Sequence, residues 1–289
     1  MPGPEDLRRR LSMNQATVPR WSTAELLEGC ARAGFGGAGL WRHRLDGLDL
    51  AGLGKQAMSD GIEISSLCRG GFFLASEAHV RKQRAEDNRR AVDEAAMLGA
   101  RVLVLVCGPA PDRDLVGARM AVAEAVAELA AYARTVGVPL AVEAMHPLYC
   151  ADRSVVVTLA QALSVAEAAA RASGGTVGVV LDSYHLWWDP ELESSVRQAT
   201  GHVLGVQLAD WVVPLADPLN GRGMLGDGSI DFKNFRFLVV ETGYEGLHEI
   251  EIFNPAIWER DPAEVLDLAA ARYQQHVAAG SVGRSASPA

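Results

Sequence analysis

Short apolar segments alternate with Ala-rich amphipathic segments along this whole chain, and this alternation constrains the fold more than any other feature. Eight of the short segments are rich in Val, Leu and Ile, which is typical of β-strands, and a helical pattern follows each one. The segment RVLVLVCG at 101–108 is apolar at almost every position, as expected for a strand buried on both faces. Strands that alternate with helices predict a parallel sheet covered by helices.

The predicted elements can be placed along the sequence by these patterns. The strands are expected at 11–18, 36–44, 62–68, 101–108, 139–147, 176–185, 202–211 and 246–253. The helices are expected at 22–35, 49–61, 84–100, 117–137, 158–175, 191–201, 231–244 and 262–280. Ser22 is the predicted N-cap of the first helix, and Gly99 and Gly137 are predicted to end the third and fourth.

Eight strand–helix units in a chain of this length predict a single (β/α)8 TIM barrel, since such barrels take about 250 residues. The barrel is expected to span residues 1–279, and the small, polar residues 280–289 are expected to form a disordered tail. An open doubly wound sheet is the alternative, but no GxGxxG opens the first unit. The longest connection without a periodic pattern, 212–230, follows the seventh strand and is therefore expected at the active face.

Charge and composition exclude several classes of protein. The net charge of −9 argues against a nucleic-acid-binding protein, because phosphate contacts need clustered Lys and Arg. No apolar run approaches the ~18 residues of a membrane span, so no membrane association is expected. The first residues lack the apolar core of a signal peptide, which favours a cytoplasmic location.

Four polar residues stand at the ends of consecutive predicted strands late in the chain: Glu143, Asp182, Gln207 and Glu251. In a barrel of parallel strands these side chains converge at the C-terminal mouth, where such barrels carry their chemistry. One acidic residue at a strand end could equally cap a helix, but four on consecutive strands favour a shared site. Their hard oxygen donors suit Mg²⁺ or Mn²⁺ better than Zn²⁺. The sequence therefore predicts a divalent metal site.

The motifs around these residues, in this order, resemble the xylose isomerase-like TIM-barrel family of sugar (phosphate) isomerases and epimerases. They are VEAMHP, LDSYH and EIEIF, and the resemblance covers nearly the whole chain. It implies that Glu143, Asp182, the strand-seven residue and Glu251 bind the metal. It also implies that Glu143 and Glu251 transfer the proton. Most of the family has His at strand seven, so Gln207 is a departure; it leaves an all-oxygen site and favours Mn²⁺ or Mg²⁺ over softer metals.

The same resemblance implies a set of residues that contact the substrate. His146 and His185 each lie three residues after a proposed ligand, and the matching family positions lie near substrate hydroxyls. Arg222 opens RGMLGDGSIDF, where the family pattern places an arginine at the mouth. Trp188 and Trp41 are expected to form part of an aromatic wall against a sugar. Each of these side chains could instead serve only the packing of the barrel rim.

The function implied is a divalent-metal-dependent isomerase or epimerase of a small-molecule sugar or keto-sugar. A proton next to a carbonyl would be moved through a metal-stabilised enediolate. One alternative is a dehydratase or lyase of a keto-sugar or keto-cyclitol on the same site. Another is a non-catalytic sugar-binding barrel that has lost its metal, which only Gln207 favours. Barrels of this family often form homodimers, but no segment of the sequence defines an interface.

Overall fold

A closed barrel of eight parallel strands forms the centre of the molecule. The structure is a computed structural model and describes residues 3–278. The strands are β1 (Leu11–Asn14), β2 (Gly37–Trp41), β3 (Glu63–Gly71), β4 (Leu103–Val106), β5 (Leu140–Glu143), β6 (Val177–Asp182), β7 (Val203–Leu208) and β10 (His248–Ile250). They follow one another around the barrel in chain order, and β10 pairs with β1 to close it. The predicted (β/α)8 barrel is confirmed.

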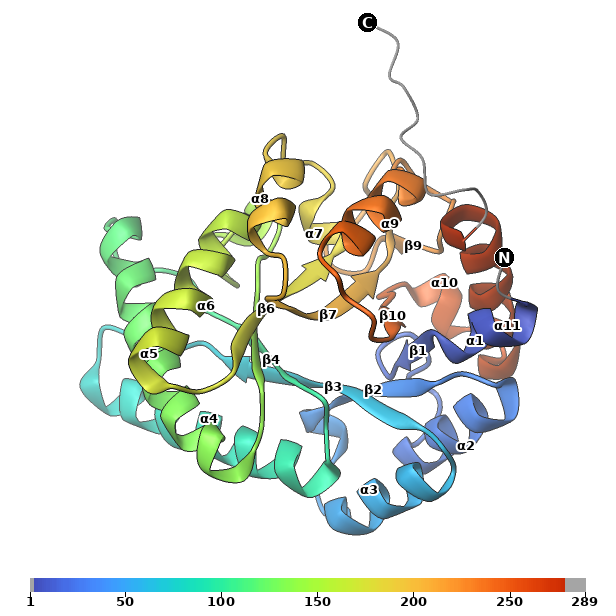
Figure 1. The fold of residues 1–289 in the computed structure, drawn as a ribbon, viewed down its shortest axis with the longest axis horizontal. Helices are drawn as coiled ribbons and strands as arrows, with labels where there is room; N and C mark the ends of the chain where they lie inside the picture. Colours follow the sequence, from blue (N-terminus) through green and yellow to red (C-terminus); the bar gives the residue numbers. More distant parts are fainter. Residues whose placement is uncertain (1–2, 279–289) are drawn as a thin grey trace, which may run out of the picture.

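Helices form a ring outside these strands (Figure 1). The long ones are α2 (Thr23–Ala33), α3 (Leu50–Ser59), α4 (Ala78–Leu98), α5 (Leu115–Val136), α6 (Leu159–Ser173), α9 (Phe232–Glu241) and α11 (Pro262–Arg272). The short ones are α1 (Pro4–Arg9), α7 (Ser183–Leu186), α8 (Leu192–Gln198) and α10 (Pro255–Trp258). Among the described residues, no helix is both long and apolar enough to cross a membrane.

The helix ends that the sequence predicts are confirmed. Ser22 caps α2: its hydroxyl accepts a hydrogen bond from the Glu25 N–H, and the Glu25 carboxylate accepts one from the Ser22 N–H. Gly99 and Gly137 end α4 and α5 in the left-handed conformation. These caps satisfy backbone groups that the helices leave without partners.

Several predicted boundaries are wrong, and a local hydrogen bond explains one of these shifts. The strand expected at 176–185 ends at Asp182, because the Asp182 carboxylate accepts a hydrogen bond from the Tyr184 N–H at 2.7 Å and starts α7. The strand expected at 202–211 divides into β7 and the two-residue strand β8 (Asp210–Trp211). The helix expected at 84–100 begins six residues earlier, at Ala78. The predicted tail at 280–289 lies outside the described residues.

Two apolar clusters occupy the two faces of the barrel wall. The larger one lies between the strands and the helices. The smaller one joins residues from six strands, and only the barrel interior borders so many strands at once. Its members are Trp41, Cys68, Val102, Val104, Ala141, Val180 and Leu204. These side chains fill one part of the interior, and polar side chains of β1, β3, β7 and β10 that hydrogen-bond with one another fill another part.

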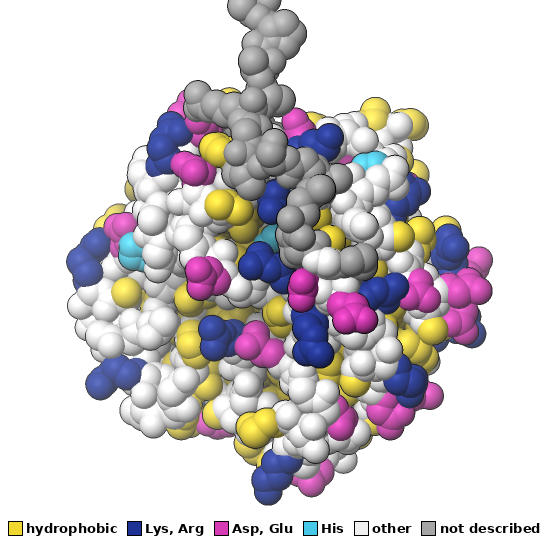
Figure 2. Space-filling model, turned by 45° about the vertical axis from the view of Figure 1, so that its right-hand side comes forward, with side chains coloured by type: hydrophobic (Ala, Val, Ile, Leu, Met, Phe, Trp, Pro, Cys, Tyr) yellow, Lys and Arg dark blue, Asp and Glu magenta, His cyan; other side chains and the backbone are white. Residues whose placement is uncertain are grey.

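The surface carries charges of both signs. On the face in Figure 2, Lys and Arg side chains lie interspersed with Asp and Glu side chains. A nucleic-acid-binding face has a continuous basic stripe, and this face does not have one in the part that the structure describes.

Buried His248 should make the stability of the fold depend on pH. Its ring contacts the Tyr273 hydroxyl at 2.9 Å, and burial, followed by Arg10 and Arg236, lowers its pKa to about 4. The unfolded chain has the ordinary histidine pKa of about 6.5, so it binds a proton that the folded state excludes between these values. The free energy of unfolding should therefore decrease as the pH falls through this window.

Replacement of His248 should remove this dependence. Between pH 7.5 and pH 5, the wild type should lose on the order of 2 kcal/mol more than His248→Gln, whose amide can keep the Tyr273 contact. Urea unfolding of both proteins at both pH values measures this difference. An equal loss in the two proteins would contradict the assignment to His248.

Candidate active site

The four predicted strand-end residues lie together at the C-terminal end of the barrel. Glu143 and Asp182 end β5 and β6, Gln207 lies one residue before the end of β7, and Glu251 follows β10. Asp182 pairs in register with Gln207. All four side chains are buried, with 1 to 6% of their surface exposed. Parallel strands point the same way, so their carboxyl ends bring these oxygen atoms to one place.

His185 lies between two of the carboxylates. Its Nε2 is 3.8 Å from Glu143 Oε1 and 3.7 Å from Asp182 Oδ2. Its Nδ1 lies 3.2 Å from the His146 N–H, and its Nε2 lies 3.3 Å from Arg222 Nη2, so a donor faces each ring nitrogen. Burial, followed by the Arg222 charge, lowers the pKa of His185 well below its usual value. The ring is therefore neutral.

Arg222 supplies the positive charge of the site. Its Nη1 donates to Glu251 Oε2 at 2.9 Å and lies 3.7 Å from Asp182 Oδ2. The guanidinium also stacks on the rings of Tyr184 and Phe253, 4.7 Å and 4.8 Å from their centres. These contacts hold one fixed cation beside three buried carboxylates.

The loop that carries Arg222 is ordered by Asp210. The predicted loop 212–230 contains β9 (Arg222–Gly223), which pairs antiparallel with β8. The Asp210 carboxylate accepts hydrogen bonds from the N–H groups of Gly226 at 2.9 Å, Gly228 at 2.8 Å and Ile230 at 3.1 Å. Asp210 thus shapes the turn after Arg222, and its side chain does not contact Gln207.

Asp210→Asn should loosen this loop. An amide cannot accept all of these N–H groups, so the variant should lose on the order of 3 kcal/mol of stability and open the 212–230 segment. Limited proteolysis, with the cleavage sites mapped by mass spectrometry, should show faster cutting there than in the wild type. Asp60→Asn, at an exposed position after α3, is the matched control. An unchanged cleavage rate in Asp210→Asn would be inconsistent with this role.

The site holds more negative charge than its own cation balances. Burial, together with the Asp182 and Glu249 carboxylates, raises the pKa of Glu251 to about 8 against the opposing charge of Arg222. Burial, together with Asp182 and Glu251, raises the pKa of Glu143 well above its usual value. Burial also raises the pKa of Asp182. An additional cation among these carboxylates would relieve this crowding.

Two ligand atoms lack partners, which fits a divalent metal at this place. Asp182 Oδ2 and Gln207 Oε1 are buried and have no hydrogen-bond partner among residues 3–278. Oxygen atoms of Glu143 and Asp182 lie within 4.8 Å of one another and of a His185 nitrogen. Unpaired buried oxygens are costly unless a cation or a ligand satisfies them. Hard oxygen donors of this kind suit Mg²⁺ and Mn²⁺.

An aromatic wall borders the site. The His146 ring stacks on Trp211 with 4.5 Å between ring centres and meets Trp188 edge-on at 5.6 Å. Burial lowers the pKa of His146 to about 4, so this ring is neutral at physiological pH. Trp41 stands across the mouth, where its Nε1–H donates to Asn14 Oδ1 at 2.8 Å and its ring meets Phe253 edge-on. The predicted substrate-contacting residues thus surround the carboxylate cluster.

The sequence prediction missed two polar residues of this cluster. Asn14 ends β1, and its side-chain amide donates to Glu249 at 2.6 Å and Glu251 at 3.0 Å. Its place at a strand end is the same signal that identified the four ligands, but it lies in the first strand, far from them in sequence. Cys68 lies in the barrel interior, 4.0 Å from the Gln207 amide nitrogen. No sequence pattern distinguishes it from the other cysteines.

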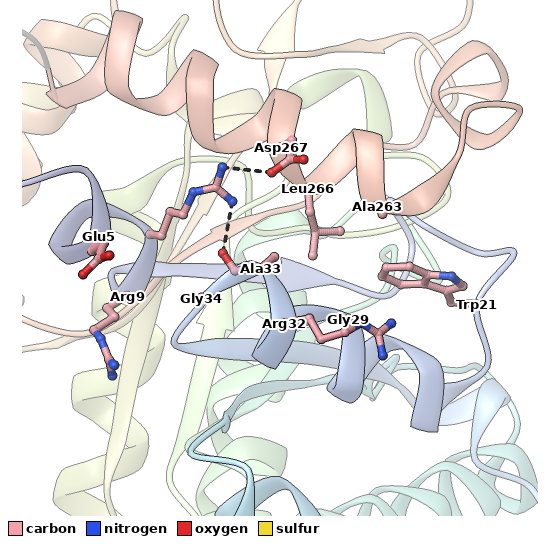
Figure 3. Close-up of a pocket in the computed structure, with 11 residues that line it drawn as sticks. Glu5, Arg9, Trp21, Gly29, Arg32, Ala33, Gly34, Ala263, Leu266 and Asp267 are labelled. Carbon is pink, nitrogen blue, oxygen red and sulfur yellow. Dashed lines mark hydrogen bonds and ion pairs between the residues drawn. The ribbon is translucent and has the colours of Figure 1, made fainter.

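One surface hollow lies away from the strand ends. It has a volume of about 640 Å³ and is bordered by α1, α2 and α11 (Figure 3). Arg8 spans it with hydrogen bonds to the Ala33 carbonyl at 3.0 Å and to Asp267 at 2.9 Å. The Trp21 ring occupies its other end, packed against Gly29. Because the Arg8 guanidinium already makes these two hydrogen bonds, this hollow is a weaker candidate for a catalytic site than the barrel mouth.

Comparison with known proteins identifies relatives of the whole barrel. A family profile described as xylose isomerase-like TIM barrel matches residues 27–274. The crystal structure of protein SMc04130 from Sinorhizobium meliloti 1021 is 40% identical, with a TM-score of 0.88, over 93% of this chain and 98% of that one. No relative was found among curated proteins.

Two further structures share the fold at lower identity. The IolI protein, solved with a bound zinc atom, is 21% identical with a TM-score of 0.79, over 93% of this chain and 98% of that one. A structure of L-ribulose 3-epimerase is 21% identical with a TM-score of 0.73, over 93% of this chain and 94% of that one. At this identity the similarity demonstrates the fold alone.

Proposed function

Because the chain belongs to the xylose isomerase-like TIM-barrel family, we propose that it is a divalent-metal-dependent sugar isomerase or epimerase. The observation that carries the proposal is the convergence of Glu143, Asp182, Gln207 and Glu251 at one end of the barrel, where two of the oxygens have no hydrogen-bond partner among the described residues. The substrate is a small sugar or keto-sugar, and the L-ribulose 3-epimerase structure supports this class.

Four residues would hold the metal: Glu143, Asp182, Gln207 and Glu251. Their oxygen atoms favour Mn²⁺ or Mg²⁺. When bound, such a metal acts as a Lewis acid that polarises a substrate carbonyl. The zinc atom bound to the IolI protein shows that this fold accepts a divalent metal in another chain.

Glu143 and Glu251 are the proposed catalytic residues, one as base and the other as acid on the carbon next to the carbonyl. A carboxylate on a cation is a weakened base, and burial opposes this effect: without a metal, burial raises the pKa of Glu251 to about 8 and that of Glu143 well above its usual value. A carboxyl with such a pKa can also accept a proton from carbon more readily than an exposed one.

Arg222 and His185 would stabilise the charge that appears on the substrate when the proton leaves. The Arg222 guanidinium already lies against Glu251, and His185 Nε2 lies 3.8 Å from Glu143 Oε1 and 3.7 Å from Asp182 Oδ2. Both side chains are buried and fixed in place, so they can stabilise an oxyanion without reorganising. Trp41, Trp188 and His146 would form the wall against the sugar, which their ring contacts around the mouth support.

Two measurements test this proposal. The first is Mn²⁺ binding by calorimetry to the metal-stripped wild type, to Glu251→Gln and to Glu241→Gln, an exposed control on α9. Binding should be weakened only in Glu251→Gln. The second is proton exchange on a panel of ketoses in D₂O, followed by NMR. Deuterium next to the carbonyl would support the epimerase, and loss of water from the sugar would indicate a dehydratase. Absence of Mn²⁺ binding in the wild type would favour a sugar-binding barrel without catalysis.

A further inference from the structure

Glu249 lies directly beneath the proposed metal site and has no role in the proposed chemistry. It pairs in register with Gln207 and points into the barrel, two residues before Glu251 on β10. Only 3% of its surface is exposed. A buried carboxylate at the centre of a barrel is costly unless many donors surround it.

The Glu249 carboxylate is surrounded by hydrogen-bond donors. Ser65 donates to Oε2 at 2.6 Å, and Ser66 donates to Oε2 at 2.8 Å. Asn14 donates to Oε1 at 2.6 Å and Gln207 at 3.2 Å. A carboxylate only accepts such bonds, so it determines which end of each neighbouring amide faces it.

The two ends of the Gln207 amide have different neighbours. The Nε2 end faces two acceptors, Glu249 Oε1 at 3.2 Å and Cys68 Sγ at 4.0 Å. The opposite atom, Gln207 Oε1, is buried and without a hydrogen-bond partner among the described residues. A glutamine that rotated by 180° about its last bond would present an NH₂ group, which cannot bind a cation. A histidine has no such ambiguity between an oxygen and a nitrogen.

The barrel also leaves space for the Glu249 carboxylate. A Cβ atom on Gly39 of β2 would lie 2.5 Å from the carboxylate carbon and from both of its oxygens. Real Cβ atoms do not approach so closely, so Gly39 permits the conformation that Glu249 adopts. Gly39 and the hydrogen-bond donors together form a site that accommodates one carboxylate.

We propose that Glu249 is a positioning residue that turns the Gln207 amide so that its oxygen faces the metal. The inference rests on the proposed function, because it assigns an orientation to one of the four proposed ligands. It explains how a glutamine can occupy this position: the buried carboxylate supplies the orientation that the amide lacks by itself. Partners of this kind, which contact a ligand and not the metal, commonly change metal affinity by about 10–100-fold.

A double-mutant cycle on Mn²⁺ affinity tests the proposal without measuring activity. Calorimetry is done on the metal-stripped wild type, Glu249→Gln, Gln207→Ala and the double variant. The loss of affinity caused by Glu249→Gln should be about tenfold larger in the chain that keeps Gln207 than in the Gln207→Ala background. A carboxylate that merely stabilised the fold or attracted the cation would cause equal losses in both, and equal losses would overturn the proposal.

Glu249→Asp separates orientation from charge, and it replaces Glu249→Gln in the cycle if that variant does not fold. The shorter side chain keeps the negative charge but withdraws the acceptor from Gln207, so the affinity for Mn²⁺ should again fall. Full affinity in Glu249→Asp would overturn the proposal in favour of a charge effect. Absence of Mn²⁺ binding in the wild type would overturn the proposed metal site together with this inference. If the wild type binds Mn²⁺ but the substitutions at residues 249 and 207 reduce its affinity independently, this inference alone would be overturned.

Discussion

Glu251→Gln is expected to reduce proton exchange by about 10³-fold, the range usual for the loss of a general acid or base. The buried amide cannot take up or release a proton, and it also removes a negative oxygen from the proposed metal site. Arg222 loses its 2.9 Å ion pair at the same time, so its charge becomes partly unbalanced. The expected result is therefore loss of turnover together with weaker metal binding.

Glu143→Gln and Arg222→Lys help to separate these effects. Glu143→Gln should reduce exchange to a similar extent, because the proposed mechanism needs both an acid and a base. Arg222→Lys should keep metal binding but slow exchange, because a lysine cannot reproduce the contacts of the guanidinium with both Glu251 and the two aromatic rings. Deuterium incorporation into a ketose, at saturating Mn²⁺, measures all three variants. Exchange at the wild-type rate in Glu251→Gln would remove Glu251 from the catalytic role.

Gln207→His is expected to raise the affinity for Zn²⁺ by about 100-fold relative to Mg²⁺. An imidazole is a ligand that Zn²⁺ prefers, whereas Mg²⁺ requires oxygen. Glu249 would lie where it can accept the second N–H of the new ring, an arrangement that is common around histidine ligands of zinc.

A competition experiment between Zn²⁺ and Mg²⁺ measures this change in relative affinity. Metal-stripped wild type, Gln207→His and Gln207→Ala are each titrated with Zn²⁺ in the presence of Mg²⁺, and the bound metal is quantified. Gln207→Ala is the matched control, since it removes the amide without adding a ring. If Gln207→His and Gln207→Ala bind the two metals in the same ratio, residue 207 does not contact the metal.

The order of the strands and the polar residues near their ends could be predicted from sequence because they depend on local patterns. The apolar runs before Glu143 and Asp182 identify two strands, and the parallel arrangement then places both side chains at one end. Capping residues such as Ser22 likewise act within a few positions of themselves. The boundary at Asp182 was mispredicted because its carboxylate both ends β6 and starts α7, and apolar periodicity does not report such a hydrogen bond.

The environment of Gln207 could not be predicted from the sequence. Its amide is held by Glu249 and Cys68, which are 42 and 139 residues away along the chain. The position of the Glu249 carboxylate in turn depends on Gly39 of another strand, because any side chain at residue 39 would clash with it. Periodicity says which face of a strand a residue occupies, but not which distant residue it meets across the barrel.

The eight strand–helix units and the four oxygen-bearing residues at strand ends follow from the sequence alone, since they depend on short-range patterns of polarity. Which atoms of these residues have partners depends on the tertiary structure. Closure of the barrel between β1 and β10 brings Asn14 against Glu249 and Glu251, and it buries the carboxylates away from water. That burial raises the pKa values of Glu143 and Glu251, and it leaves Asp182 Oδ2 and Gln207 Oε1 without a hydrogen bond among the described residues.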